Sequence, residues 1–313
     1  MSAVDHVTVR VPATSANLGP GFDALGLALA LHDEVTAEVI DGPTRVTVIG
    51  EGAGELPTDD YHLVVRAMHA AFDVLGARPI RVALTCRNRI PQARGLGSSS
   101  AAIVAGIMIA QALSGGELDA LRLAADIEGH PDNVAPCLLG GFTIAWTTPA
   151  GSRAVGLKPA HGVPLTVLVP AERGLTAEAR AALPGSVPFA DAALTAGRAA
   201  LLVHALTAAP YLLLEATEDR LHQGYRAPAM PATAALVGRL RGAGVAAVVS
   251  GAGPSVLALS PIPAGFDAGP GWRVSSVTVD QVGATLIAGP TPDPAGNQGQ
   301  HAEVDPVAAG RAS

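Results

Sequence analysis

The segment that decides the fold reads PQARGLGSSSAA and covers residues 91–102. It places Gly95 and Gly97 between a strand-like stretch and an apolar stretch that begins at Ser98. A helix N-terminus presents unpaired backbone N–H groups and a partial positive charge, and a glycine-rich approach lets an anion come close to them. Serine hydroxyls at the same place can donate to phosphate oxygens or bind Mg²⁺, which prefers hard oxygen ligands. The segment therefore predicts a phosphate cradle at the start of a helix.

This cradle does not match the two common nucleotide-binding motifs. No lysine follows Gly97, as the GxxxxGK[ST] motif requires, and the spacing is not GxGxxG. A tight turn before a serine-capped helix explains the same residues without any ligand, because serine is a good N-cap. On this segment alone, both interpretations stay open.

Two further glycine-rich loops favour the ligand interpretation. Residues 13–26 read ATSANLGPGFDALG and contain Asn17 and Asp23, and residues 250–255 read SGAGPS between two apolar strands. Each loop alone is typical of an ordinary turn. Three such loops in a chain with a single lysine predict one small-ligand pocket built largely from backbone.

A cluster of polar residues, EGHPDN, occupies residues 128–133. A zinc site built on His130 is disfavoured, because Pro131 directly after it is typical of the first position of a helix. Glu128 is instead a candidate ligand of Mg²⁺ beside Ser98. The alternative is that Glu128 is a solvated carboxylate at a helix end.

Charge and composition limit the class of partner. The 313-residue chain has a net charge of −7, which argues against nucleic acid or an anionic membrane as partner. Its two cysteines are too few for a disulfide framework, and no secretory leader is recognised, so a cytoplasmic location is expected. The apolar stretch at 101–113 is shorter than the ~20 residues of a membrane span. A homodimer stays open.

The length of the chain predicts two domains, at residues 1–155 and 156–288, followed by a disordered tail at 289–313. In the first domain we expect a strand at 7–11 ended by Pro12 and an antiparallel strand pair around a turn at 41–43. Further elements are expected from the apolar periodicity. They are helices at 62–75, 98–113 and 118–127, strands at 80–90, 142–148, 164–170, 245–250 and 255–260, helices at 176–183, 191–206 and 232–242, and a last strand at 272–280 that residues 283–288 extend.

Taken together, the motifs resemble the GHMP kinase superfamily. Its Pro-x-x-x-Gly-Leu-Gly-Ser-Ser signature is matched by Pro91, Gly95, Leu96, Gly97, Ser98 and Ser99. The segments at 11–29, 128–136 and 250–256 are similar to those of the members that phosphorylate homoserine. The resemblance spans residues 9–288. It implies an α/β (α+β) fold of two domains, an N-terminal one like a ribosomal protein and elongation factor and a ferredoxin-like C-terminal one.

The resemblance also implies ATP and Mg²⁺ as cofactors. Backbone from Arg94 to Ser99 would wrap the ATP phosphates, with Ser98 and Glu128 as the metal ligands. His62 stands where the family has an asparagine near adenine. Reaction at an acceptor hydroxyl would need little help from a base, because phosphoryl transfer depends mainly on positioning and charge neutralisation.

The implied acceptor is L-homoserine, which carries an ammonium, a carboxylate and a hydroxyl. Asp23 and Asp132 are candidates for the ammonium, and Asn17 and Asn133 for orienting polar groups. Arginine pairs a carboxylate bidentately, and two arginines occupy the matching positions of the family. The remaining implied site residues are Arg180, Arg226, Thr176 and Gly251, and the catalytic set is Glu128, Asn133 and Arg180. The alternatives are a sibling kinase of a sugar or isoprenoid alcohol, and a non-catalytic ligand-binding regulator.

Overall fold

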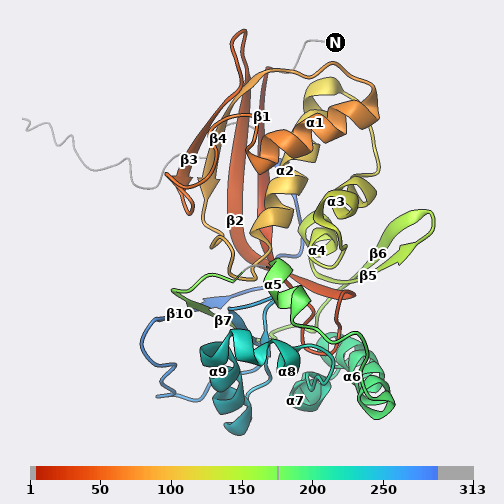
Figure 1. Ribbon diagram of the computed structural model, residues 1–313, viewed down its shortest axis with the longest axis vertical. Helices are drawn as coiled ribbons and strands as arrows, with labels where there is room; N and C mark the ends of the chain where they lie inside the picture. Colours follow the sequence, from red (N-terminus) through yellow and green to blue (C-terminus); the bar gives the residue numbers. More distant parts are fainter. Residues whose placement is uncertain (1–4, 175, 288–313) are drawn as a thin grey trace, which may run out of the picture.

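The computed structural model describes residues 5–174 and 176–287, and these form two sheets with helices packed on each (Figure 1). The larger sheet has seven strands, in the order β11-β1-β2-β4-β3, with β5 paired to β2 and β6 paired to β5. Its strands are β1 (His6–Ala16), β2 (Leu25–Val39), β3 (Arg45–Gly50), β4 (Val82–Asn88), β5 (Phe142–Thr148), β6 (Gly151–Leu157) and β11 (Thr285–Ile287). The mixed α/β class expected from the sequence is confirmed.

Four helices belong to the larger sheet. They are α1 (Leu63–Leu75), α2 (Ser98–Ser114), α3 (Ala120–Glu128) and α4 (Val134–Leu139). Helices α2 and α4 pack against β1, and α1 and α3 pack on α2 (Figure 1). Helix α2 is apolar nearly all round because it is enclosed on both sides, and Gly106 within it lies against the backbone of Val64 in α1. The three helices expected in the first half of the chain, at 62–75, 98–113 and 118–127, are confirmed as α1 to α3.

The expected end of the first strand at Pro12 is wrong. Strand β1 continues to Ala16, and its register with β2 shifts between Pro12 and Ala13. Proline has no N–H to give to a ladder, and a bulge is one of the places in a sheet that tolerates it. The strand therefore carries Thr14, Ser15 and Ala16 directly to the rim of the ligand cavity described below.

The expected antiparallel pair around residues 41–43 is also wrong. Strand β4 lies between β2 and β3, antiparallel to β2 and parallel to β3. The local turn signal at Asp41-Gly42-Pro43 is real, but β4, some forty residues further along, takes the hydrogen bonds of both strands. The predicted extension of the last strand is corrected as well: β11 leaves β10 (Trp272–Val277) and pairs with β1 of the larger sheet.

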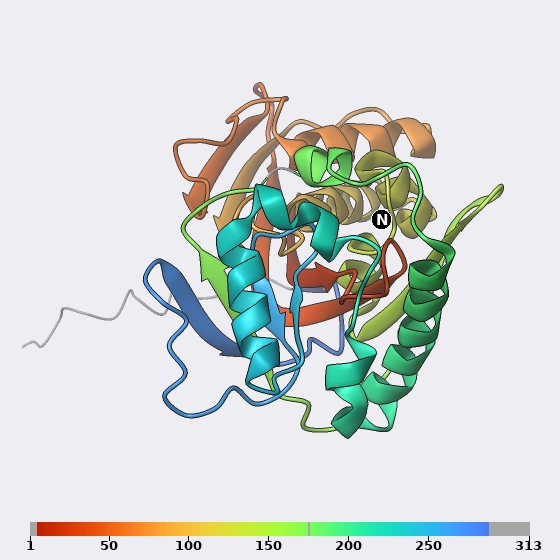
Figure 2. The ribbon, with the colours of Figure 1, turned by 60° about the horizontal axis from the view of Figure 1, so that its bottom comes forward.

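The smaller sheet has the antiparallel order β10-β7-β9-β8, with β7 (Leu165–Pro170), β8 (Ala247–Val249) and β9 (Val256–Ala258). Its helices are α5 (Thr176–Ala181), α6 (Phe189–Thr207), α7 (Leu213–Ala216), α8 (Gln223–Arg226) and α9 (Pro231–Gly242), with 3-10 turns at Pro210–Leu212 and Ala227–Ala229. Helix α9 packs on β8 and β9, on the side away from the larger sheet (Figure 2).

The two halves share one core. Val167 of β7 and Leu257 of β9 belong to the large apolar cluster that also contains the interior of the larger sheet. Leu168, with the opposite orientation, belongs to a small cluster under α9. The division of the chain at residue 155 stays a prediction, and residue 155 itself lies within β6. The predicted tail at 289–313 lies outside the described residues.

Among the described residues, only helix α6 has the length and composition of a membrane span. It lies on the outside of the smaller half, and 22% of it is buried (Figures 1 and 2). Helices of globular proteins pass the same test, so this finding carries little weight beside the net negative charge of the chain.

Candidate active site

A cavity of about 380 Å³ lies where the two halves meet. Its walls come from the β1–β2 loop, the start of α1, the loop before α2, the end of α3, and the turn between β8 and β9. Most residues predicted from the sequence line it: Asn17, Asp23, His62, Arg94, Gly95, Gly97, Ser98, Ser99, Glu128, Asp132, Asn133, Arg180, Arg226 and Gly251. Pro91 and Leu96 are buried beside it without lining it, and the side chain of Thr176 lies outside what the structure describes.

The glycine loop approaches β1 and the turn between β8 and β9 too closely for a side chain at Gly95 or Gly97. Gly95 has φ +72° and Gly97 has φ +71°. A Cβ at Gly97 would overlap the hydroxyl of Thr14, and one at Gly95 would overlap the carbonyl of Ser250. Gly97 is the N-cap of α2 and supplies no side-chain bond to its first turn. The interpretation of the segment as a serine-capped turn is therefore wrong, and the first N–H groups of α2 have no side-chain cap.

The side chain of Arg94 braces this loop rather than pointing a free charge into the cavity. Its guanidinium donates to the carbonyls of Gln92, Pro170 and Ala171, at 2.9, 3.0 and 2.7 Å. These bonds tie the loop of the larger half to the end of β7 in the smaller half.

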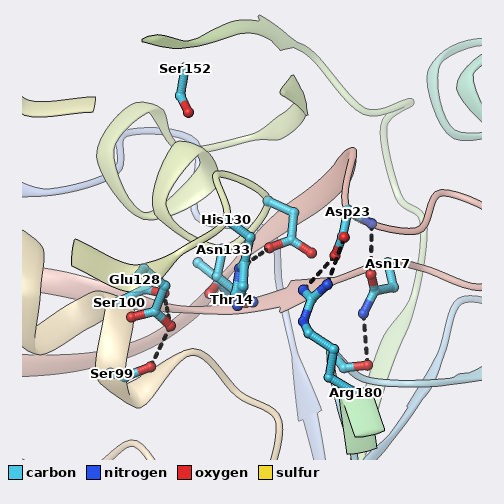
Figure 3. Close-up of polar contacts among 12 residues, drawn as sticks. Thr14, Asn17, Asp23, Ser99, Ser100, Glu128, His130, Asn133, Ser152 and Arg180 are labelled. Carbon is cyan, nitrogen blue, oxygen red and sulfur yellow. Dashed lines mark hydrogen bonds and ion pairs between the residues drawn. The ribbon is translucent and has the colours of Figure 1, made fainter. Parts of the chain in front are cut away.

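Glu128 lies beside the first turn of α2, held by serine hydroxyls (Figure 3). Ser99 Oγ donates to Glu128 Oε1 at 2.6 Å, and Ser100 Oγ donates to the same oxygen at 3.1 Å. Within the described part of the chain these bonds come from Ser99 and Ser100, while Ser98 lines the cavity next to them. No group of three or more His, Cys, Asp or Glu side chains of metal-binding type occurs among the described residues. The donors present suit a Mg²⁺ ion that uses one carboxylate and takes its other ligands from phosphates and water.

The polar cluster at 128–133 forms a turn, and the expected helix start at Pro131 is wrong. Helix α4 begins at Val134, with Asn133 as N-cap. His130 Nδ1 donates to Asp132 Oδ1 at 2.7 Å, and this hydrogen bond raises the pKa of His130. Asn133 Oδ1 accepts from Thr14 Oγ1 at 2.9 Å. Thr14 is fully buried in β1 and was not singled out by the sequence.

At the other end of the cavity, one amide and one ion pair join three loops (Figure 3). Asn17 Nδ2 donates to the carbonyl of Gly251 at 2.9 Å, and its Oδ1 accepts the N–H of Asp23 at 3.0 Å. Asn17 and Asp23 have φ of +67° and +55°, a conformation that asparagine and aspartate tolerate best among residues with a Cβ. Asp23 in turn accepts two hydrogen bonds from Arg180, at 2.8 and 2.9 Å.

Arg226 is the other predicted arginine, and it is only 2% exposed. Its guanidinium donates to the carbonyls of Ala179 and Gly251, at 3.0 and 3.4 Å, and to His222 Nδ1 at 3.2 Å. Within the described residues no carboxylate pairs with it, so a buried positive charge lies at the cavity wall. Burial, and after it the neighbouring Arg180, lower the pKa of Arg226.

His222 fixes Arg226 and was also missed by the sequence. It is fully buried, and its Nε2 donates to the carbonyl of Gly19 at 2.7 Å. That bond leaves Nδ1 as the acceptor for Arg226. Burial lowers the pKa of His222, in keeping with a neutral ring.

His62 closes the end of the cavity beside α1. It is the N-cap of that helix, and its Nδ1 accepts the N–H of Val64 at 3.3 Å. Burial lowers the pKa of His62, so the ring is neutral and its hydrogen-bond pattern assigns the proton to Nε2. Nε2 is buried and has no hydrogen-bond partner within the described residues. An unmet N–H donor therefore lies at this end of the cavity.

Asp33 of β2 anchors the chain that leads into the glycine loop. Its Oδ1 accepts the N–H groups of Arg89 and Ile90, at 2.6 and 2.8 Å. Burial raises the pKa of Asp33 from 3.8 to about 6, although both hydrogen bonds act in the opposite direction. The carboxyl therefore loses its proton within the folded protein only as the pH approaches neutrality.

We expect Asp33→Asn to change how the free energy of unfolding depends on pH. A raised folded-state pKa means that ionisation of Asp33 weakens the folded state as the pH rises from 4 to 7, by up to about 3 kcal/mol. Asparagine keeps an oxygen for both N–H bonds and carries no charge. The difference in unfolding free energy between variant and parent, from urea titrations, should therefore grow over this range.

Asp280→Asn is the matched control with the opposite sign. Burial acts to raise the pKa of Asp280, but the hydrogen bond from His32 and two backbone N–H groups lower it overall. The stability that this carboxylate provides is present above its ordinary pKa and lost as the pH falls. A flat difference curve for Asp33→Asn would show that the buried carboxyl does not titrate in this range.

The cavity and fold agree with what is found among known proteins. The family model of the GHMP kinases N-terminal domain matches residues 62–141. A homoserine kinase of Streptomyces coelicolor is 56% identical over 291 residues, which are 90% of this chain and 94% of that protein. One of Clavibacter michiganensis is 57% identical over 264 residues, 82% of this chain and 84% of that protein.

Solved structures show the same relationship. The homoserine kinase of Cytophaga hutchinsonii matches with a TM-score of 0.80 at 30% identity, over 92% of this chain and 99% of that chain. A mevalonate kinase, at 13% identity and a TM-score of 0.59, shares the fold alone. A glycine loop at the start of a buried helix, on this two-sheet fold, is the architecture of a GHMP kinase. By its relatives, the chain belongs to the homoserine kinase family.

Proposed function

We propose that this chain transfers the γ-phosphoryl group of ATP to the side-chain hydroxyl of L-homoserine. The observation that carries the proposal is the composition of a cavity that contains both the glycine loop and side chains of both signs of charge. Gly97 and Glu128 lie in its wall together with Asp23 and Arg226. A phosphate-binding end and a zwitterion-binding end in one cavity suit a kinase of a small amino acid.

At the nucleotide end, the glycine loop would take the phosphates. Gly95 and Gly97 let the loop pack against Ser250 and Thr14, where a Cβ would clash, and the first turn of α2, whose N-cap Gly97 has no side chain, offers N–H donors to an anion. The unpartnered Nε2–H of His62 supports a nucleobase at the α1 end, because purines offer ring nitrogens as acceptors. Mg²⁺, when bound with ATP, would neutralise phosphate charge, and Glu128 with its neighbouring serines has the hard oxygen donors that suit it.

At the acceptor end, the cavity provides both signs of charge. Arg226 carries a buried charge without a carboxylate partner in the described residues, which favours the acceptor carboxylate there. Asp23 and Asp132 would receive the ammonium. Asn133, fixed by Thr14, would orient the hydroxyl that attacks.

No aspartate–lysine pair stands in this site to deprotonate the hydroxyl. The chain has one lysine, Lys158, and it is not among the residues that line the cavity. Phosphoryl transfer through a loose transition state asks mainly for alignment of the acceptor and neutralisation of charge. Both Asn133 and the arginines serve alignment, and the hydroxyl proton can leave with the phosphate product.

The proposal is tested with a panel of acceptors. ADP release and phosphorylated product are measured for L-homoserine, L-threonine, mevalonate and galactose with the purified chain. Turnover of L-homoserine above the others supports the proposal. A preference for a sugar or an isoprenoid alcohol would replace it with a sibling kinase, and ATP binding without any turnover would indicate a regulator.

We expect Asp23→Asn to weaken acceptor recognition much more than ATP binding. The variant keeps the shape but loses the charge that faces an ammonium, so the KM for L-homoserine should rise about 30-fold. The Kd of ATP, from calorimetry, should stay within about twofold, because the side chain of Asp23 bonds to Arg180 and to no residue of the glycine loop. Asp191→Asn is the control, since Asp191 forms a similar ion pair with Arg220 on the surface. Equal losses for both ligands would contradict the role of Asp23.

The acidic character of the chain supports a cytoplasmic enzyme without a nucleic-acid or membrane partner. The location, the absence of such partners and the oligomeric state stay predictions. Size-exclusion chromatography with light scattering of the full chain measures the oligomeric state.

A further inference from the structure

Three cationic or polar side chains surround the ring of Phe22. This residue lies in the β1–β2 loop, and no role was assigned to it from the sequence. The Cζ atom of Arg226 lies 5.2 Å from the ring centroid and that of Arg180 lies 5.6 Å from it. The ring of His222, which fixes Arg226, is 5.1 Å away at an angle of 31°. Phe22 is half-buried and immediately precedes Asp23, the carboxylate partner of Arg180.

Two guanidinium groups at one cavity wall repel each other, and the structure neutralises only one of them. Arg180 is paired with Asp23, whereas Arg226 has carbonyl and imidazole partners but no carboxylate among the described residues. The neighbouring charge of Arg180 is one cause of the lowered pKa of Arg226. The charges of Asp23, Asp219 and Asp132 offset part of this repulsion without a direct bond to Arg226. The ring of Phe22, by contrast, lies against both guanidinium groups.

An aromatic ring can do this without cancelling the charges. The face of the ring is electron-rich and attracts a guanidinium within about 6 Å of its centroid, and arginine is the cation that stacks there most often. A carboxylate in the same place would pair with Arg226 and compete with the acceptor. A ring stacked on the guanidinium does not compete with an anion for the N–H donors, which lie in the guanidinium plane.

The turn that carries Phe22 is rigid enough to hold the ring in place. A Cβ at Gly21 would overlap the side chain of Leu25, so only glycine fits before Phe22. Asp23 after it has φ +55° and its N–H is held by Asn17. The residues on both sides of Phe22 are thus held in place, Gly21 by its contact with Leu25 and Asp23 by its bond to Asn17. The ring is therefore kept beside the arginines.

We propose that Phe22 is a positioning residue for the acceptor carboxylate, whose ring holds the guanidinium groups of Arg180 and Arg226 side by side without itself taking any of their N–H donors. The proposal rests on the proposed function for the identity of the acceptor. It adds a residue that acts through the arginines and has no part in nucleotide binding.

The sharpest test changes the ring electronically and leaves its shape almost intact. Mono-, di- and trifluorinated phenylalanines at position 22 progressively weaken the negative face of the ring. We expect the KM for L-homoserine to rise stepwise to about tenfold, with kcat changed less than about twofold and the Kd of ATP unchanged. The melting temperature should stay constant along the series, because packing is retained.

Substitutions of Phe22 by standard amino acids complete the test. Phe22→Leu removes the ring and should raise the KM for L-homoserine about 20-fold, whereas Phe22→Tyr keeps the ring face and should lie within about threefold of the parent. Phe266, which lies 5.5 Å from the Cζ of Arg239 away from the cavity, is the matched control. The same fluorinated series at position 266 should not alter the KM. If Phe22→Leu does not fold, the fluorinated series still decides.

One measurement needs no acceptor and so separates this proposal from the proposed function. In the ligand-free chain, the Nε–Hε signals of Arg180 and Arg226 should show ring-current shifts that Phe22→Leu abolishes. If these shifts are present while L-homoserine is not turned over, the proposed function fails and the arrangement of the ring stands. An unchanged KM throughout the fluorinated series, with L-homoserine as a substrate, overturns the proposal.

Discussion

Glu128→Gln is expected to lower kcat by about 10²–10³-fold, the usual cost of removing one group that stabilises charge in a transition state. Glutamine keeps the size of the side chain and an oxygen that can accept from Ser99 and Ser100, so the property lost is the negative charge. A Mg²⁺ ion bound through a single protein carboxylate depends strongly on that charge. The concentration of Mg²⁺ needed for half-maximal turnover, at fixed ATP, should therefore rise about tenfold or more.

Asp126→Asn is the matched control for this change. Asp126 lies on the same helix, α3, two residues before Glu128, but it is exposed and does not line the cavity. The Asp126→Asn substitution removes one negative charge from the same helix, and it should leave both kcat and the Mg²⁺ requirement unchanged. If Glu128→Gln retained the parental Mg²⁺ dependence, the assignment of the metal to this carboxylate would be lost.

The glycine loop could be predicted from the sequence because its signals are local. Glycines at fixed spacing before an apolar helical stretch require particular backbone conformations, and residues 91–102 adopt them. Helices α1 to α3 were predictable for the same reason, since α1 and α3 have an apolar periodicity, α2 is apolar along its length, and each of the three ends at a glycine. Such features depend on nearest neighbours in the chain.

The order of the strands could not be predicted, because pairing is decided by segments far apart in sequence. The turn at Asp41-Gly42-Pro43 suggests a hairpin, yet β4 separates β2 from β3. Strand β11 joins β1 across nearly the whole length of the chain. Neither the placement of β4 between β2 and β3 nor the pairing of β11 with β1 can be recognised from the sequence near those strands.

The candidate site shows the same division between local and distant signals. Polar residues in unusual patterns, such as Asn17 and Asp23, were identified, and they line the cavity. Thr14, Phe22 and His222 were missed, because each acts on a partner far away in the chain: Asn133, Arg180 with Arg226, and Gly19. Which serine hydroxyls reach Glu128 could not be predicted locally either, since the position of Glu128 relative to α2 decides it. Ser98 as a metal ligand stays a prediction.

At the acceptor end of the cavity the chain forms an ion pair of its own. Arg180 and Asp23, the groups proposed for the carboxylate and the ammonium, are bonded to each other. A zwitterion can replace this pair with two new ones at little net cost in charge, whereas a neutral sugar would break it without compensation. The arrangement therefore favours an amino acid through the penalty on other acceptors as much as through attraction.

Gly97→Ala is expected to lower the affinity for ATP about 100-fold and the unfolding free energy by about 3 kcal/mol, because two separate costs add. The residue has φ +71°, which disfavours any Cβ, and that Cβ would overlap the hydroxyl of Thr14. Relief requires α2 to move away from β1, and this movement withdraws the N–H groups proposed to bind phosphate. Calorimetry with ATP and denaturant unfolding measure the two effects.

Gly115→Ala separates the two costs, because Gly115 ends the same helix with nearly the same φ, +68°, and has nothing within 4 Å of its Cβ position. It carries the conformational cost alone, about 1 kcal/mol, and should bind ATP like the parent. The excess loss at Gly97 then measures the contact between the loop and β1. Equal effects of the two substitutions on ATP binding would mean that the close approach of α2 to Thr14 does not shape the phosphate site, and the nucleotide would have to bind elsewhere in the cavity.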